Sequence, residues 1–214
     1  MELTTWLGTL MIVMASSSAA ESPTIMLPPP QTSGGKPLMQ ALSERRSTRE
    51  FSRQALPAQT LSNLLWAAAG VNRAEAGKRT APSARDWQEI DIYVTTADGA
   101  YLYDPVAHAL RLMVARDVRA LTGVQDFLAE APVNLVYVAN LQRMSDAAQE
   151  QQEFYAATDT GFIAQNVYLF CTSEGLATVV RGSVERDVLA KALGLAAHQR
   201  ITLAQTVGFP AHAP

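Results

Sequence analysis

The sequence predicts an α+β domain in which an antiparallel or mixed sheet is flanked by helices. Residues 89–96 alternate between apolar and polar side chains, and the Asp98-Gly99 pair that follows is a strong hairpin signal. Residues 132–139 form a continuous apolar run, which is typical of a central buried strand. A long helix is expected from about Met144 or Ala147 to Ser173. Strands joined by hairpins, with helices outside them, belong to the α+β class.

The other elements follow from local signals. Apolar residues at Leu38, Ala41 and Leu42 have the spacing of a short helix over residues 36–45. Pro57 opens a second helix and Gly70 stops it, after which residues 71–79 form a polar loop. Further strands are expected at 100–103, 108–114, 177–181 and 201–208, and further helices at 118–128 and 184–193.

Length and composition favour one folded domain. The chain has 214 residues, of which 48% are apolar, and this suffices to bury a sizeable core and excludes a disordered chain. The formal net charge is −3 and the predicted pI is about 5.6. There is therefore no global basic field that would attract nucleic acid or an anionic membrane.

The first residues resemble a secretory signal peptide. Residues 1–20 have an apolar core and end in small residues before Glu21, although Glu2 is unusual in such a signal. An uncleaved anchor or a misassigned start are the alternatives. Cleavage would place the protein in the periplasm or outside the cell without stable membrane association, and otherwise it is cytoplasmic. Residues 21–35, rich in Pro, Ser and Gly, are expected to be an extended linker, which leaves the domain at 36–214.

Metal and thiol chemistry are not expected. Cys171 is the only cysteine and lies in an apolar helical run, so it is interpreted as a packing residue. No histidine has the spacing of a zinc site, and the three are His108, His198 and His212. Glycine-rich nucleotide motifs and the nucleophile elbow are also absent from the sequence.

Residues 44–51 are the strongest candidate for a binding site. They read E-R-R-S-T-R-E-F, with three arginines and two hydroxyls where the first helix is expected to end. Guanidinium groups match phosphate oxygens, and a hydroxyl adds a donor of different reach. Basic residues are also favoured in a last helical turn by the helix dipole alone, but here the charge continues past the helix. The pattern therefore favours a phosphate site.

This motif resembles the flavin-phosphate motif of the nitroreductase family, whose members are FMN-dependent NAD(P)H oxidoreductases. Residues 80–88, T-A-P-S-A-R-D-W-Q, are similar to the family's loop beside the flavin ring. Residues 159–182 contain S-E-G-L-A and are similar to the family's interface helix and the loop after it. The likeness runs from about residue 37 to 210, and the T-A-P-S-A loop looks more like the branch that dehydrogenates azoline rings.

The resemblance implies non-covalent FMN and assigns roles to residues. Arg45, Ser47 and Arg49 would hold the phosphate region, with Arg49 also near the N1/C2 side of the flavin. Family members often have Asn at the position of Asp86, and an ionised Asp can only accept hydrogen bonds. Gln88 is a plausible substitute. The implied cofactor-binding residues are Arg45, Arg46, Ser47, Arg49, Pro82, Ser83, Ala84, Arg85, Gln88, Glu174 and Gly175.

Glu174 and Gly175 are the reaction-centre candidates that the resemblance implies. Their backbone would face flavin N5, although Glu174 also fits a surface charge before a turn, and Gly175 fits a left-handed helix cap. The implied reaction is ping-pong, in which hydride passes from NAD(P)H to the flavin and then to an electrophilic acceptor such as a quinone or nitroaromatic. No side chain is required as an acid or a base.

The family's members are intertwined homodimers with flavin between subunits, so helix 147–173 is expected at the interface. Its small residues, Gly161 among them, allow close approach, although the pattern alone fits a core helix equally well. One departure concerns the end of the chain, where many members have a basic phosphate ligand that this sequence lacks. Arg181 or Arg79 are candidates to replace it.

Three alternatives to this reading remain open. Nicotinamide cofactors are scarce outside the cytoplasm, so an exported member would use another donor or oxidise its substrate. Alternatively, the protein binds flavin without NAD(P)H turnover, as Asp86 and the missing basic tail suggest. A structural partner protein is a third reading, which rests only on the long apolar helix.

Overall fold

The computed structural model describes residues 23–212, so the expected signal peptide at 1–20 lies outside the described residues. A seven-stranded sheet forms the centre of the domain, in the order β1-β6-β5-β4-β7-β9-β8, and every neighbouring pair is antiparallel. The expected antiparallel sheet is therefore confirmed. Its strands are β1 Thr24–Met26, β4 Ile90–Thr95, β5 Ala100–Asp104, β6 Ala109–Val114, β7 Val133–Asn140, β8 Ala177–Arg181 and β9 Gln199–Gly208.

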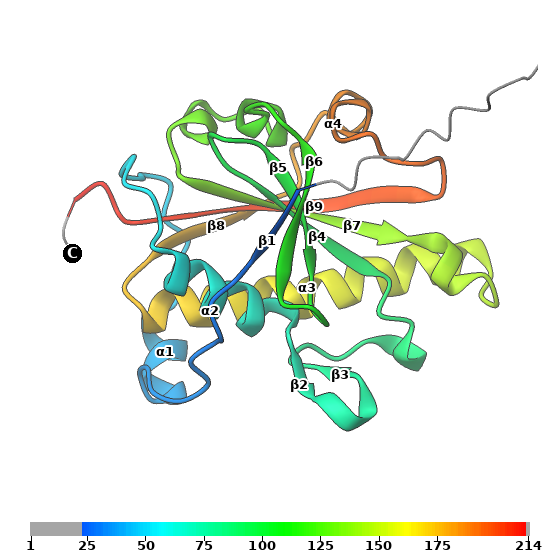
Figure 1. Ribbon diagram of the computed structural model, residues 1–214, viewed down its shortest axis with the longest axis horizontal. Helices are drawn as coiled ribbons and strands as arrows, with labels where there is room; N and C mark the ends of the chain where they lie inside the picture. The colour runs from blue at the N-terminus through cyan, green and yellow to red at the C-terminus, as the bar shows by residue number, and fades with distance from the viewer. Residues whose placement is uncertain (1–22, 213–214) are drawn as a thin grey trace, which may run out of the picture.

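Helices cover both faces of this sheet (Figure 1). Helices α2 Ala58–Ala69 and α3 Gln149–Ser173 pack on one face, and α4 Arg186–Leu193 packs on the other. The short helix α1 Leu38–Glu44 lies against α3 near that helix's C-terminal end (Figure 1). The long helix thus runs beneath the sheet and connects the region of α1 with the opposite end of the domain.

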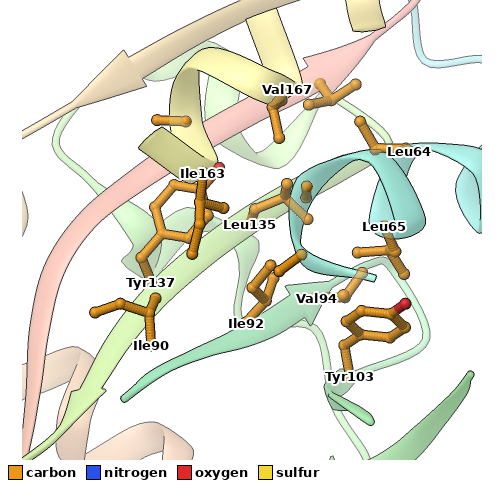
Figure 2. Packing of buried hydrophobic residues seen from close by; sticks show 14 of the residues in the cluster. Leu64, Leu65, Ile90, Ile92, Val94, Tyr103, Leu135, Tyr137, Ile163 and Val167 are labelled. Carbon is orange, nitrogen blue, oxygen red and sulfur yellow. The ribbon is translucent and has the colours of Figure 1, made fainter. Parts of the chain in front are cut away.

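The core forms because β4 and β7 direct alternate side chains to the two faces. Three side chains point towards α2 and α3 and pack with Leu64 and Leu65 (Figure 2). They are Ile92 of β4 and Leu135 and Tyr137 of β7. The opposite side chains, Tyr93, Val136 and Val138, pack with α4 instead. Residues of β7 from Val133 to Ala139 are all buried, which confirms the central strand.

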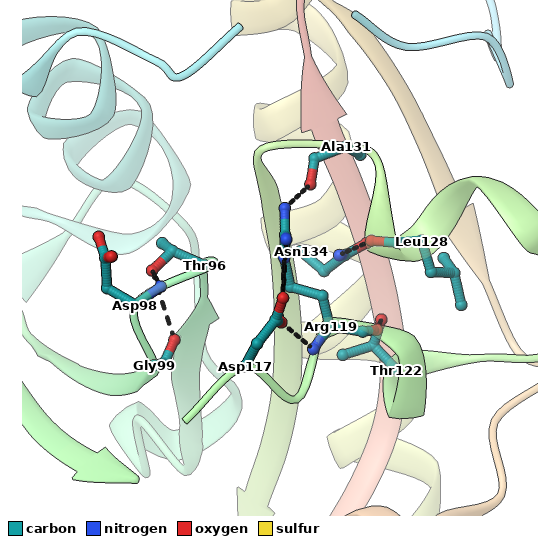
Figure 3. Close-up of polar contacts among 9 residues, drawn as sticks. All are labelled: Thr96, Asp98, Gly99, Asp117, Arg119, Thr122, Leu128, Ala131 and Asn134. Carbon is teal, nitrogen blue, oxygen red and sulfur yellow. Dashed lines mark hydrogen bonds and ion pairs between the residues drawn. The ribbon is translucent and has the colours of Figure 1, made fainter. Parts of the chain in front are cut away.

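Two stretches differ from the sequence prediction. The polar loop at 71–79 contains a two-stranded hairpin, β2 Val71–Arg73 and β3 Lys78–Arg79. The helix expected at 118–128 is divided into two 3₁₀ helices, Arg119–Thr122 and Asp126–Ala129, which Gly123 separates. Side-chain bonds to backbone carbonyls hold this connection (Figure 3): Arg119 donates to the Ala131 carbonyl and Asn134 to the Leu128 carbonyl.

The segment expected to be a free linker is packed on the domain in part. Strand β1 pairs with β6, and Leu27 is buried. The hydroxyl of Ser62 donates to the Pro28 carbonyl at 2.6 Å and lies 2.7 Å from Nε2 of His108. Residues from Thr24 onward therefore belong to the folded domain, because the sheet edge and α2 supply partners for their backbone.

The remaining expectations concern membranes, metals and the thiol. Within residues 23–212, no helix is both long and apolar enough to cross a membrane. The same residues contain no group of three or more His, Cys, Asp or Glu side chains suited to a metal ion. Cys171 is fully buried in α3, and this burial raises the pKa of its thiol, as expected for a packing residue.

Candidate functional site

The arginine segment begins where α1 ends, as the sequence predicts. Arg45 is the C-cap residue of α1, and its guanidinium lies 5.2 Å from the ring centroid of Tyr168 on α3. Two residues later, the Ser47 hydroxyl is 2.8 Å from the Tyr168 hydroxyl. The amide of Thr48 then donates to the Thr178 carbonyl of β8 at 3.0 Å. The segment is thus fixed along one side while its outward side chains stay exposed.

A cavity of about 730 Å³ adjoins this segment. Arg45, Arg46 and Gly175 line it together, so the structure brings these three expected site residues into one space. Lys36 and His212 line the same cavity, which places up to four basic groups around it. Ser47 and Arg49 are not among its lining residues, and both are exposed. The volume and the basic lining suit an anionic ligand of nucleotide size.

Acidic groups in this region are partly neutralised. Lys36 forms an ion pair with Glu44, and Gln40 donates a further hydrogen bond to the same carboxylate. The hydrogen bond from Lys36, followed by that from Gln40, lowers the pKa of Glu44. Glu44 therefore stays ionised, and Glu50 lines the same cavity. A phosphate there would meet Arg45 and Arg46, for which no ion pair is formed within residues 23–212.

The end of α3 supplies the other half of this space. Gly175 has φ +70°, the left-handed conformation expected for the residue after a helix end. The Glu174 amide donates to the Phe170 carbonyl at 2.9 Å, so it is already used by the helix. Among residues 23–212, the Gly175 amide has no hydrogen-bond partner, and nothing lies within 4 Å of a Cβ built there. Gly175 rather than Glu174 therefore presents a free backbone donor.

Glu174 lines a second cavity, of about 550 Å³, between α2, α3 and residues 31–36. Lys36 borders both cavities, so the two spaces are neighbours. The lining of the second cavity is rich in amides and includes one indole. Its members include Asn63, Trp66, Asn72, Asn166 and Ser173.

The loop at residues 82–88 has an unusual backbone. Three of its residues have positive φ, a backbone region that residues other than glycine rarely adopt. They are Arg85 at 49°, Asp86 at 59° and Gln88 at 48°. The Ser83 hydroxyl accepts from the Gln88 amide at 2.8 Å, and Asp159 of α3 accepts from the Ala84 amide at 2.9 Å. These two bonds hold a strained loop in one conformation.

The side chains of this loop have partners of their own. Gln88 donates its side-chain amide to the Gly77 carbonyl and to Asp86. Bonds from Gln88 and Lys78 lower the pKa of Asp86, which keeps it ionised and able only to accept. Arg85 stacks over the Trp87 ring at 5.1 Å.

Within one chain, the loop and the arginine segment lie at well-separated places along α3. The loop is fixed at Asp159, whereas Gly175 follows the helix end at Ser173. At 1.5 Å per residue, Asp159 and Ser173 are about 21 Å apart along the helix axis. In Figure 1, α1 lies at one end of α3 and the β2–β3 hairpin lies further along it. One chain thus does not bring the expected site residues together.

The two arginines considered as replacements for a C-terminal phosphate ligand are both used elsewhere. Arg181 is buried and donates to the Thr122 carbonyl, to Asn134 and to Thr206, and burial lowers its pKa to about 10. Arg79 lines a small cavity beside Ser83 instead. The basic residue that does line the arginine cavity after β9 is His212.

Sequence reasoning also missed Tyr168. Its hydroxyl contacts Ser47 and accepts from the Val180 amide at 3.0 Å, so it ties the arginine segment to α3 and β8. The sequence contains a weak signal for it, because a tyrosine in a buried helical stripe needs a partner for its hydroxyl.

Comparison with known proteins decides the family. The model of the Nitroreductase family matches residues 42–209. This chain belongs to the nitroreductase family. It is therefore a flavin-dependent oxidoreductase of α+β fold, and the family resemblance stated from the sequence is confirmed.

Two relatives and one more distant structure illustrate the match. A Methanocaldococcus jannaschii protein named as a nitroreductase is 36% identical over 156 residues, covering 68% of this chain and 78% of that protein. A Ralstonia eutropha crystal structure with the same family name is 45% identical, with a TM-score of 0.85 over 96% of this chain and 97% of that one. A Desulfovibrio desulfuricans nitroreductase-type structure in complex with FMN is 21% identical, with a TM-score of 0.61 over 84% and 90% of the chains.

Proposed function

We propose that this nitroreductase-family protein binds FMN non-covalently and uses it to transfer hydride from NAD(P)H to an electrophilic acceptor. When bound, FMN would supply the hydride-accepting atom N5 and the ping-pong chemistry with a nitroaromatic or quinone. The observation that carries the proposal is the shared lining of one cavity by Arg45, Arg46 and Gly175. The FMN complex of the Desulfovibrio structure supports the choice of cofactor.

The phosphate end of the cofactor would meet the basic part of the cavity. Arg45 and Arg46 offer guanidinium forks, which match phosphate oxygens better than a point charge does. His212 takes the place of the basic residue that the sequence lacks after its last strand. Ser47 and Arg49 lie beside the cavity in the same exposed segment, and we assign them to the ribityl chain and to the N1/C2 side of the flavin ring.

The reaction centre would be the turn after α3. The Gly175 amide is the free donor there, and the absence of a side chain allows an aromatic ring to approach the backbone closely. The Glu174 amide is already bonded to the Phe170 carbonyl, so Glu174 would contribute only as a lining residue of the neighbouring cavity. That neighbouring cavity is the space for the nicotinamide or the acceptor.

A homodimer would complete the site. Because the 82–88 loop lies about 21 Å from the helix end within one chain, by the 1.5 Å rise per residue, the loop of a second copy would contact the flavin. The side of α3 that faces away from the sheet is open in the single chain, with Phe154, Gly161 and Phe162 exposed. Leu38 and Met39 of α1 are exposed as well. These apolar surfaces fit an interface centred on α3.

The absorption spectrum of the full chain as isolated tests this proposal directly. We expect a yellow protein that bleaches with NADPH under anaerobic conditions and recovers on addition of a quinone. A yellow protein that does not respond would instead be a flavin-binding protein without NAD(P)H turnover, or a dehydrogenase with another donor. A colourless protein that does not take up added FMN would overturn both readings.

Export is a separate proposal, because it concerns residues 1–20 alone. N-terminal sequencing of material recovered from the periplasm or the medium would give Glu21 as the first residue. Material that begins at Met1 and stays in the cytoplasm would contradict it.

A further inference from the structure

Two carboxyl groups meet in the interior beneath the 82–88 loop. Glu89, just before β4, has 0% of its surface exposed, and Asp159 of α3 has 2%. The two side chains line one small cavity and bind adjacent residues of the loop, Ser83 and Ala84. Two adjacent buried carboxylates repel strongly and lack solvent, so one of them keeps a proton at neutral pH.

Both members of this pair hold the loop. Asp159 accepts from the Ala84 amide at 2.9 Å, and Glu89 accepts from the Ser83 hydroxyl at 3.2 Å. The same Ser83 hydroxyl accepts from the Gln88 amide, which closes the turn over the left-handed residues Arg85 and Asp86. The strained backbone of the loop therefore depends on the carboxyl groups of Glu89 and Asp159, which share one proton.

The pair also leaves buried polar atoms without hydrogen bonds, which is unusual for a contact that only stabilises the fold. Oε1 of Glu89 is buried and has no hydrogen-bond partner among the described residues, and neither has Nε of Arg79. Both residues line a small cavity of about 20 Å³, with Ser83 and Asp159 on its other walls. A volume of that size admits one water molecule, which could join the two groups.

The other charged side chains near the Glu89–Asp159 pair form ion pairs with different partners. Lys78 pairs with Asp86, Arg85 with Asp146, and Arg143 with Asp91. Among the described residues that line the cavity, Arg79 is the only cation. Burial, followed by the Asp159 charge, raises the pKa of Glu89 to about 7. The proton is therefore released within the physiological range.

We propose that Glu89 and Asp159 are positioning residues that share one proton and hold the 82–88 loop in its flavin-contacting conformation. The flavin-binding part of this proposal rests on the proposed function. The shared proton does not, because it depends only on the side chains of this chain. Loss of the proton leaves two buried negative charges side by side, and their repulsion releases Ser83 and Ala84. Flavin affinity then falls as pH rises.

The proton itself is measured first, without ligand. Carboxyl ¹³C NMR of the protein, assigned with Glu89→Gln and Asp159→Asn, should show two coupled titrations, one of them near neutrality. The proposal is overturned if both groups are fully ionised at pH 6. This measurement does not depend on flavin, so it separates the shared proton from the proposed function.

Affinity for FMN is measured second. If only the protonated pair holds the loop, the dissociation constant of the parent should rise about tenfold from pH 6 to pH 8. The phosphate of FMN titrates near pH 6 and would change affinity in the opposite sense, so riboflavin is titrated in parallel. A dissociation constant for riboflavin that is equal at both values of pH would overturn the positioning role.

Variants complete the test. Glu89→Gln and Asp159→Asn keep the acceptor oxygens but remove the repulsion, so both should hold the pH 6 affinity at pH 8. Asp159→Ala loses the bond to Ala84 and should bind flavin weakly at both. Glu153→Gln, an exposed carboxylate on the same helix, is the control and should keep the parent's profile. A protein that binds no flavin at any pH would contradict the proposed function. The NMR titration would still show whether Glu89 and Asp159 share a proton.

Discussion

The Ser47 hydroxyl lies 2.8 Å from the Tyr168 hydroxyl and thereby joins the arginine segment to the long helix. Tyr168 also accepts from the Val180 amide, so one phenol connects three parts of the chain. The position of Arg45 follows from this connection, because its guanidinium lies over the same ring. Arg45 is thus placed by packing against Tyr168.

Tyr168→Phe tests this connection. The substitution leaves the Val180 amide and the Ser47 hydroxyl without a partner, so we expect a loss of about 1–3 kcal/mol in the free energy of unfolding. FMN affinity should fall as well, because Arg45 loses its fixed position. Urea unfolding and flavin titration measure the two effects. Tyr101→Phe, at a half-buried position on β5, is the control and should change neither.

Arg45 and Arg49 are expected to differ in what they bind. Arg45 lines the cavity assigned to the phosphate, so Arg45→Ala should weaken FMN about 10- to 100-fold, the loss of a hydrogen bond to a charged group. Riboflavin, which has no phosphate, should bind this variant like the parent. Arg49→Ala should weaken both ligands, because Arg49 is assigned to the ring. Arg53→Ala, an exposed residue paired with Glu130, is the control. If the double variant at 45 and 49 keeps FMN as tightly as the parent, the assignment is wrong.

His212 gives a milder prediction. As an exposed partner of the phosphate it should contribute about 0.2–1 kcal/mol, so His212→Ala should weaken FMN by no more than about fivefold. His212→Lys places a permanent cation there and should restore or tighten binding. Both effects should shrink at high salt, because exposed charges are screened. Equal affinities for all three proteins at low salt would remove His212 from the site.

The pattern of successes and failures along the chain has physical reasons. The hairpin at Asp98-Gly99, the buried run of β7 and the cap at Gly175 were predicted because their signals are local. Residues 24–27 were interpreted as a free linker because their partners, β6 and Ser62, lie far away in sequence. Composition describes a segment's own preferences and not the edge to which it pairs.

The site shows the same limit. The motifs pointed to Arg45, Arg46 and Gly175, and the fold places all three around one cavity. Tyr168, His212 and Glu89 were missed, because each acts through a contact that no sequence spacing records. The separation of the 82–88 loop from the arginine segment was also invisible, since it depends on where along α3 each is attached.

Stability should depend on pH through Glu89. Its folded-state pKa of about 7 lies above the ordinary value of 4.5, so between these values the folded chain holds a proton that the unfolded chain has released. The folded state binds more protons, and stability therefore falls as pH rises through this window. Thermal unfolding across the window should show the fall in the parent and a flatter profile in Glu89→Gln. A parent whose melting temperature rises steadily over the same range would contradict this.

Gly161 separates the long helix's role in folding from its role in assembly. No atom lies within 4 Å of a Cβ built at Gly161, so Gly161→Leu is accommodated by the single chain. It should even stabilise the helix by up to about 1 kcal/mol, the ordinary cost of glycine in a helix. A homodimer packed closely through α3 would instead be disrupted. Light scattering with size exclusion should show a dimer for the parent and for Lys191→Leu on the opposite face, and a folded monomer for Gly161→Leu. If Gly161→Leu stays dimeric, the interface does not run through this point of α3.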